Sequence, residues 1–190
     1  MAKRKALATV ENVAELLKDG IVIDSIKDRT KDFKSVEEKC KRKNYENTAG
    51  SQTPKYDINT IRNYVQDIVG IRVITLYHSD VYKIYEAIKK TELVISHVDD
   101  YIKRPKESGY RSLHLVVMVQ VPTNDGSKLV PVEIQLRSKA MDLWAAYDHK
   151  FRYKNNSPDP ESIVLLQDLA VSIIDTDEKA ERIRAKKPAT

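Results

Sequence analysis

Cysteine is nearly absent from this sequence of 190 residues, in which Cys40 is the only one. One thiol can build neither a disulfide framework nor a cysteine-rich metal site, so both classes are excluded. The opening residues, MAKRKALATVEN, also lack the apolar segment that a secretory signal needs. We therefore expect a protein that works in the reducing cytoplasm.

Glycine is scarce as well, with five residues, and the glycine-rich phosphate loops are missing, since neither GxxxxGKS/T nor GxGxxG occurs. Any bound phosphates must therefore be held by side chains and a metal ion. Long apolar runs are missing too. The longest apolar stretch, residues 163–174, contains Gln167 and Asp168 and is too short to cross a bilayer, so we expect no membrane protein.

Charge, by contrast, is abundant: 32% of the residues are charged, the net charge is +5 and the pI is about 9.1. The excess of positive charge favours an anionic partner, either nucleotides or nucleic acid, although solubility alone also explains it. The length and the 41% of hydrophobic residues predict one globular domain, residues 1–190, with a substantial core.

Strands and helices interleave along the sequence. Apolar residues at helical spacing predict helices with approximate bounds 9–19, 35–45, 79–90, 138–154 and 160–184. Asp57 can cap a further helix, and Ser35 and Glu38 have the spacing of a capping box. β-branched and alternating segments predict strands within residues 68–77, 92–102, 107–121 and 128–138.

A hairpin turn is indicated by TNDGS, residues 123–127, between the last two predicted strands. One antiparallel hairpin among interleaved helices and strands predicts an α+β (or α/β) fold. We expect a mixed β-sheet of about five strands flanked by helices, with residues 20–155 as its core and the last helix beside it.

A polar row marks the start of one predicted strand. Tyr110, Ser112 and His114 alternate and therefore share a face, and Glu133 and Gln135 share the polar face of the next strand. If the hairpin pairs the two strands, these faces coincide. Polar groups at such positions are costly unless a ligand uses them, and part of a nucleotide would.

Two carboxylates stand in the most informative places. Asp67 lies where a helix is expected to meet a strand, and Glu133 lies in the middle of a strand. One interpretation is solvent exposure or a salt bridge with Arg72 or Arg111. The other is a Mg²⁺ site completed by substrate phosphates, which is how proteins usually hold Mg²⁺.

Basic residues form two clusters. One begins with Arg29, Lys31 and Lys34 before a predicted helix and continues along that helix, and the other comprises Lys103, Arg104 and Lys106, just before Tyr110. Cations beside the free N–H groups of a helix start can cradle phosphates, although a charged helix face is often only solvated. Two clusters suit two phosphate-bearing ligands better than one.

Four segments together resemble the motif regions of the RelA/SpoT-type alarmone synthetase domain, in the family's order and with similar spacing. They are DRTKDFKSVEEKCKRK, DIVGIRVI, KESGYRSLH and VEIQLRSKAMDLWAAYDHKFRYK. The resemblance covers roughly residues 20–155, and the length is similar to that of the single-domain small alarmone synthetases. It implies a nucleotidyltransferase-like synthetase domain. The His-Asp dipeptide of the family's hydrolase half does not occur in the sequence.

The resemblance implies a Mg²⁺-dependent pyrophosphokinase that transfers the β,γ-pyrophosphate of ATP to the ribose 3′-hydroxyl of GDP or GTP and releases AMP. It implies Asp67 and Glu133 as catalytic residues and Mg²⁺ ligands, with Glu133 placed to take the 3′-hydroxyl proton. It implies an ATP site made of Arg29, Lys31, Ser35, Lys39, Arg42 and Arg72, with Arg29 and Arg72 stacked on the adenine. The GDP or GTP site it implies consists of Tyr110, which stacks on guanine, and His114, Lys106, Lys103 and Gln135.

The sequence departs from the family pattern at three positions. Asp148 stands where the family usually has Glu, and Ser25 and Asp142 stand where tetrameric members bind an allosteric alarmone. We expect no such regulation, because an acidic residue repels a polyphosphate. The resemblance also implies a homo-oligomer, a tetramer or a dimer, and the predicted first helix is shorter than usual.

Two alternatives remain at this point. A toxin-type relative would keep the ATP site and pyrophosphorylate tRNA 3′ ends or adenosine nucleotides, and the lysine-rich helix is compatible with tRNA. A non-catalytic nucleotide-binding or nucleic-acid-binding module would need neither Asp67 nor Glu133, and both are present.

Overall fold

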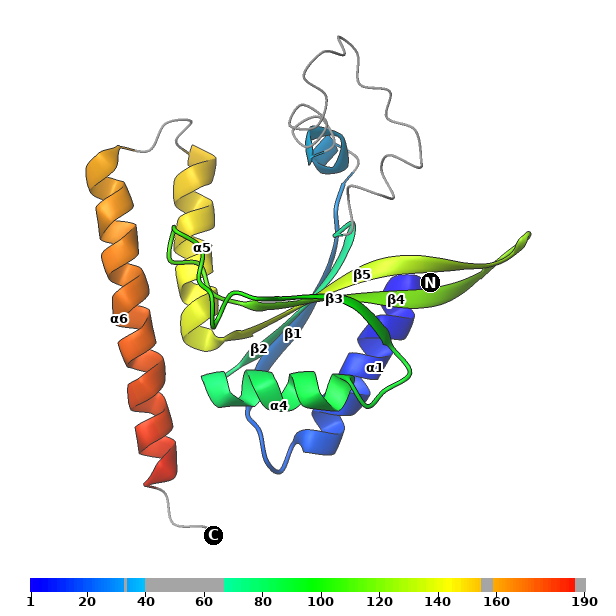
Figure 1. Ribbon diagram of the computed structural model, residues 1–190, viewed down its shortest axis with the longest axis horizontal. Helices are drawn as coiled ribbons and strands as arrows, with labels where there is room; N and C mark the ends of the chain where they lie inside the picture. Colours follow the sequence, from blue (N-terminus) through cyan, green and yellow to red (C-terminus); the bar gives the residue numbers. More distant parts are fainter. Residues whose placement is uncertain (33, 40–66, 155–158, 187–190) are drawn as a thin grey trace.

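The structure is a computed structural model that describes residues 1–32, 34–39, 67–154 and 159–186 (Figure 1), with the side chains of 152–154 outside that description. Three features of the sequence prediction lie outside the described residues: Cys40, Arg42 and the helix capped by Asp57.

Within the described residues, five strands form one mixed sheet in the order β1-β2-β5-β4-β3. Their bounds are β1 Ile23–Thr30, β2 Val69–Thr75, β3 Val94–Asp100, β4 Leu113–Thr123 and β5 Gly126–Ser138. The pair β2 and β5 is parallel and the other neighbours are antiparallel. The predicted mixed sheet of about five strands is confirmed, and the hairpin joins β4 to β5 as expected.

β1 is a strand that the sequence pattern did not indicate. It lies at one edge of the sheet, pairs with β2 alone, and exposes residues 27–30. A charged edge strand buries too little to show the alternation by which a half-buried strand is recognised. Arg29 therefore lies on a strand and Lys31 directly after it, rather than in a loop before a helix.

Two helices, α1 Ala2–Leu17 and α4 His78–Ile88, cover one face of the sheet (Figure 1). The predicted start of the first helix near residue 9 was wrong, because the helix begins seven residues earlier. Ala2, Ala6, Val10 and Val13 are buried at spacings of three and four, which is the inward face of a longer amphipathic helix.

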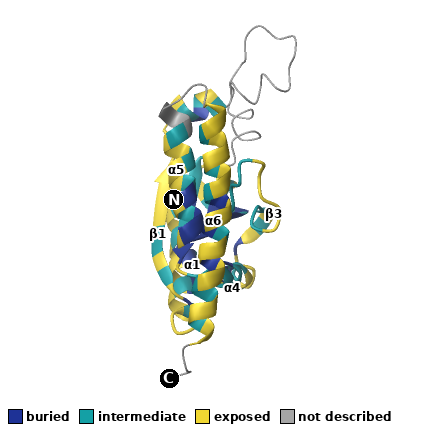
Figure 2. Cartoon of the chain, turned by 90° about the vertical axis from the view of Figure 1, so that its left-hand side faces the viewer, coloured by how far each residue is buried: buried dark blue, intermediate teal, exposed yellow. Residues whose placement is uncertain are grey.

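The other two long helices, α5 Lys139–Lys154 and α6 Pro160–Ala185, lie side by side at one end of the sheet (Figure 1). Trp144 of α5 packs with Ala170 and Ile173 of α6, and its indole N–H donates to the carbonyl of Leu166 at 2.9 Å. The outer side of α6 is largely exposed (Figure 2). No helix in the described part of the chain has the length and apolar character of a membrane span.

Gly109 allows the loop before β4 to approach α6. Its φ of +89° is one that residues with a side chain rarely adopt. A Cβ at this position would lie 2.5 Å from the Cβ of Ala170 and 3.7 Å from the Trp144 ring. The loop can therefore reach α6 only with glycine here, and Tyr110 follows directly.

We expect Gly109→Ala to lower the free energy of unfolding by about 1–3 kcal/mol more than Gly126→Ala does, measured by urea denaturation. Gly126, the first residue of β5, also has a positive φ of +110°, but no atom of the described residues lies within 4 Å of its added Cβ. Comparing the two variants therefore separates the cost of a strained backbone, which both share, from the cost of steric overlap, which only Gly109→Ala has. Equal losses in the two variants would mean that the contact with α6 does not constrain the loop.

Candidate active site

Polar side chains gather on the sheet face that α1 and α4 leave uncovered. Strand register puts four of them in one row across the sheet: Lys27, Arg72, Gln135 and His114. A second row contains Arg29, Gly70 and Glu133. Directly opposed residues share a face, so Glu133, Gln135 and His114 share one face, as the sequence analysis expected.

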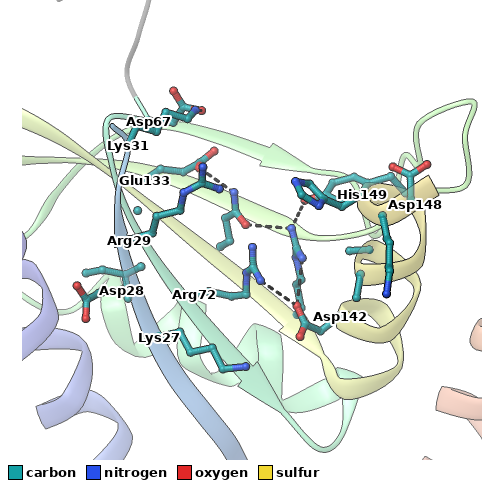
Figure 3. A pocket seen from close by; sticks show the side chains of 18 residues that line it. Lys27, Asp28, Arg29, Lys31, Asp67, Arg72, Glu133, Asp142, Asp148 and His149 are labelled. Atoms are coloured by element: carbon teal, nitrogen blue, oxygen red, sulfur yellow. Dashed lines mark hydrogen bonds and ion pairs between the residues drawn. The ribbon is translucent and has the colours of Figure 1, made fainter. Parts of the chain in front are cut away.

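A cleft of about 1210 Å³ opens over these rows, and α5 forms one of its walls. Figure 3 shows Arg29, Arg72 and Glu133 pointing into the cleft from the sheet, with Asp142 and His149 on the α5 side. Gly70, between Arg29 and Glu133, has no side chain and leaves room there. The sequence-predicted residues that line the cleft are Arg29, Lys31, Asp67, Arg72, Tyr110, Glu133 and Gln135.

Asp67 lies just before β2, with its carboxylate between two lysines. One carboxylate oxygen, Oδ2, pairs with Lys31 and, at 2.7 Å, with Lys39. Burial alone would raise the pKa of Asp67, but the hydrogen bonds and charges of the two lysines outweigh it and lower the pKa below its ordinary value. The side chain is therefore an anion at neutral pH, and its other oxygen, Oδ1, is buried with no hydrogen-bond partner among the described residues.

Glu133 is the second carboxylate of the cleft. Burial acts to raise its pKa, but the hydrogen bond and the positive charge of His114, together with a hydrogen bond from Gln135, outweigh burial and lower the pKa. The charge of Asp67 opposes this decrease, which means that the two carboxylates are close enough to interact. Both are ionised at neutral pH and face the same space, as a shared cation requires.

Glu133 belongs to a closed ring of hydrogen bonds. Arg137 donates to Tyr110 Oη at 2.6 Å and to Gln135 Oε1 at 2.9 Å, and Gln135 Nε2 donates to Glu133 Oε2 at 2.7 Å. Glu133 Oε1 accepts from His114 Nδ1 at 3.0 Å, and His114 Nε2 meets Tyr110 Oη at 2.7 Å. With a neutral His114 the ring assigns its proton to Nδ1, and Tyr110 donates to Nε2.

Two residues of this arrangement were missed as site residues by the sequence analysis, namely Arg137 and Asp142. The Arg137 side chain is 5% exposed and also pairs with Asp142 Oδ1 at 3.2 Å, and Arg72 reaches the same oxygen at 3.4 Å. The sequence signal for Arg137 is strand alternation, because residues 133, 135 and 137 share one face of β5. Nothing local in the sequence shows that α5 brings Asp142 to both arginines.

Tyr110 lines the cleft and has aromatic rings and cations around it. The Lys106 ammonium lies 5.1 Å from the Tyr110 ring centroid and 4.5 Å from that of Tyr101. Tyr101 in turn meets the His114 ring edge-on at 5.3 Å, and Tyr110 lies 6.2 Å from Trp144. This surrounding fixes the ring of Tyr110 next to a cation, which suits a planar ligand that carries phosphates.

The other predicted residues have different positions. Lys103 is on the opposite side of the sheet, with its ammonium 3.6 Å from Asp100 and 5.2 Å from the Tyr82 ring centroid, so the structure does not bring it to the cleft. Ser35 does not head a capping box as expected, because Asp32 is the cap, accepting hydrogen bonds from Ser35 N at 2.8 Å and Oγ at 2.9 Å. Arg42 lies outside the described residues.

Asp67 and Glu133 both line the cleft and are side chains there that could hold a hard cation. The unpartnered Oδ1 of Asp67 is the kind of buried oxygen that a metal ion satisfies, and carboxylate oxygens are preferred Mg²⁺ ligands. In the described part of the chain, no group of three or more His, Cys, Asp or Glu side chains could hold a metal by itself. Mg²⁺ would therefore need further oxygens from water and from the phosphates of a nucleotide.

A comparison with known protein families shows the family to which this chain belongs. Residues 28–158 match the family described as the region found in RelA / SpoT proteins. This chain belongs to the RelA/SpoT family. The resemblance seen in the four sequence segments is thereby confirmed.

Two relatives of the RelA/SpoT family are enzymes of Bacillus subtilis. GTP pyrophosphokinase YwaC is 37% identical over 142 residues, which are 74% of this chain and 63% of YwaC. The chain thus spans slightly less than two thirds of that protein. GTP pyrophosphokinase YjbM is 33% identical over 182 residues, which are 95% of this chain and 81% of YjbM.

A solved structure of the same family has the same fold. Small alarmone synthetase 1 from B. subtilis bound to its product pppGpp has a TM-score of 0.81 and 29% identity, with 96% of this chain and 90% of that chain covered. The same synthetase bound to AMPCPP has a TM-score of 0.74 and 27% identity, with 97% and 91% covered. The chain is thus similar in sequence and in fold to proteins described as small alarmone synthetases.

Proposed function

We propose that this protein is a GTP pyrophosphokinase, which transfers the β,γ-pyrophosphate of ATP to the ribose 3′-hydroxyl of GDP or GTP and yields (p)ppGpp and AMP. One observation carries the proposal: a single cleft holds Glu133 with two arginines on one side and Tyr110 on the other. Such an arrangement accommodates a donor and an acceptor with a carboxylate between them. The names of YwaC and YjbM support the same activity.

The donor would lie along β1 and β2. Arg29 and Arg72 are on neighbouring strands and both line the cleft, where their guanidinium planes can stack on adenine. Lys31 and Lys39, which pair with Asp67 here, would bind the donor phosphates together with Ser35 and Arg42. We assign ATP to this half because it combines stacking groups with cations.

The acceptor would lie over β4 and β5. Tyr110 would stack on the guanine, and Lys106 beside it would meet the 5′ phosphates, for which Lys103 would have to move from Asp100. His114 was expected to bind these phosphates as well, but both its ring nitrogens bond to Tyr110 and Glu133. We propose that His114 holds Glu133 in place and that Gln135 does the same from the other side.

In this reaction the protein contributes mainly by positioning the two substrates and by supplying positive charge, rather than by forming covalent bonds to them. The acceptor 3′-oxygen attacks the β-phosphorus of ATP, the bond from that phosphorus to the α–β bridging oxygen breaks, and AMP leaves with that oxygen. Glu133 accepts the 3′-hydroxyl proton. Mg²⁺, when held by Asp67 and Glu133, would neutralise charge on the transferred phosphates. Lys31 and Lys39 add positive charge next to the same group.

The experiment that tests the proposed function uses ATP labelled at the γ-phosphate, with Mg²⁺ and one acceptor at a time from GDP, GTP, ADP and tRNA. We expect the label in ppGpp and pppGpp, with one AMP formed for each. Label on tRNA or ADP, or no transfer at all, would contradict the proposal. The named relatives are GTP pyrophosphokinases, which gives the tRNA-modifying alternative no support.

We expect Tyr110→Ala to weaken GDP binding about tenfold or more, because a base stacked on an aromatic ring gains about 1–3 kcal/mol. Binding of AMPCPP, measured by calorimetry, should change much less. Tyr110→Phe is the matched control, since it keeps the ring and removes only the hydroxyl that bonds Arg137 and His114. Equal losses for AMPCPP and GDP in Tyr110→Ala would exclude the stacking role.

We also propose that the protein is a homo-oligomer of the cytoplasm. Exposed apolar side chains on the outer helices support self-association: Leu143, Tyr147, Val164, Leu165 and Val171. Figure 2 shows that much of α6 is exposed. Light scattering of the purified protein measures the number of subunits directly.

A further inference from the structure

Asp142 lines the cleft and contacts two of its arginines, Arg72 and Arg137. It lies in the first turn of α5, and its side chain is 20% exposed. One oxygen, Oδ1, accepts from Arg137 at 3.2 Å and from Arg72 at 3.4 Å. A single carboxylate oxygen thus joins the arginine of the proposed donor site to an arginine that contacts the proposed acceptor site.

The two arginines depend on this carboxylate for their charge balance. Burial lowers the pKa of Arg72, the positive charge of Arg137 lowers it further, and Asp142 acts in the opposite direction. Within the described part of the chain, the Nε of Arg72 is buried without a hydrogen-bond partner, so the contact of NH1 with Asp142 sets the direction of its guanidinium. Without Asp142, two like charges would face each other in a partly buried site.

Arg137 carries the contact to the acceptor side. Its NH2 donates to Tyr110 Oη at 2.6 Å and to Gln135 Oε1 at 2.9 Å, while NH1 holds Asp142. Its guanidinium carbon also lies 5.2 Å from the Tyr110 ring centroid. The rigid planar fork of arginine can make these contacts at the same time, which an ammonium on a flexible stem cannot.

We propose that Asp142 is a positioning residue that couples the two nucleotide sites, so that binding of donor and acceptor strengthens each other through Arg72 and Arg137. The inference rests on the proposed function, because it takes ATP as the ligand beside Arg72 and a guanosine nucleotide as the ligand beside Tyr110. A donor that orders Arg72 also fixes Asp142, which fixes Arg137 and the Tyr110 hydroxyl. By linkage the effect is equal in both directions.

The test measures the dissociation constant of GDP with and without saturating AMPCPP by calorimetry, in the presence of Mg²⁺. We expect AMPCPP to strengthen GDP binding about fivefold or more in the unchanged protein. In Asp142→Asn this factor should fall below about twofold, and Asp142→Glu should restore part of it. Asp175→Asn is the matched control, since Asp175 forms an exposed ion pair with Lys179 on α6.

A second variant keeps the test valid if Asp142→Asn does not fold. Arg137→Lys keeps the charge but cannot hold Asp142, Tyr110 and Gln135 together, so the coupling factor should fall there too. An unchanged coupling factor in either folded variant would overturn the inference, even if GDP binding alone became weaker. Failure of the unchanged protein to bind AMPCPP or GDP would instead overturn the proposed function on which it rests.

Discussion

Glu133→Gln should reduce the rate of pyrophosphate transfer by about a thousandfold or more. The substitution removes the group that accepts the 3′-hydroxyl proton, and it removes half of the anionic pair that would hold Mg²⁺. Gln is nearly isosteric with Glu and still offers one oxygen to the hydrogen-bond ring that contains His114 and Gln135. The loss should therefore appear in turnover rather than in folding. The measurement is the initial rate of AMP release with ATP and GDP.

Binding controls make this prediction specific. AMPCPP and GDP should bind Glu133→Gln within a few-fold of the unchanged protein, because Arg29, Arg72 and Tyr110 are untouched. Glu86→Gln is the matched substitution, since Glu86 pairs with Lys89 on the exposed side of α4 and should leave the rate unchanged. A Glu133→Gln enzyme that keeps a tenth of the activity or more would remove Glu133 from the chemistry.

Asp67→Asn should produce the second largest loss of turnover, about a hundredfold or more. Unlike Glu133→Gln, it should also change how AMPCPP binds. Removal of the carboxylate frees Lys31 and Lys39, whose charges then act on the donor phosphates without a counter-ion. We therefore expect AMPCPP to bind at least as tightly as before when Mg²⁺ is absent. Addition of Mg²⁺ should strengthen this binding far less than in the unchanged protein.

Calorimetric titration of AMPCPP with and without Mg²⁺ measures both effects in Asp67→Asn. Asp175→Asn, which alters an exposed ion pair on α6, serves as the control of the same chemical change. If Asp67→Asn kept the full dependence on Mg²⁺, the metal ion would have to be held elsewhere. Weaker binding of AMPCPP without Mg²⁺ would show that Asp67 positions the two lysines instead of competing for them.

The sheet face could be predicted because its residues follow strand alternation. Glu133 and Gln135 lie two apart in one strand, and the TNDGS turn fixes how that strand pairs with the one that contains His114. Register then brings residues from the hairpin into one row. β1 was not predicted, because an edge strand with exposed charges shows no apolar alternation. The start of α1 was missed because small buried residues, Ala2 and Ala6, are weak hydrophobic signals.

The other residues of the site come together through contacts between segments that are far apart in the sequence, which no local sequence pattern predicts. Arg137 could be assigned to the correct face, but its burial follows from α5 and from Tyr110 packing around it. Asp142 faces two arginines from different strands, which requires the angle between α5 and the sheet. Lys103 was assigned to the GDP or GTP site by the family resemblance, yet in the structure it pairs with Asp100.

The central claim is that one divalent cation lies between Asp67 and Glu133 when both nucleotides are bound. The most direct measurement is anomalous X-ray diffraction from crystals that contain Mn²⁺, AMPCPP and GDP. We predict a single strong anomalous peak about 2.1 Å from Oδ1 of Asp67 and from an oxygen of Glu133. A peak held by phosphates alone, or bound at any place away from these two carboxylates, would contradict the account.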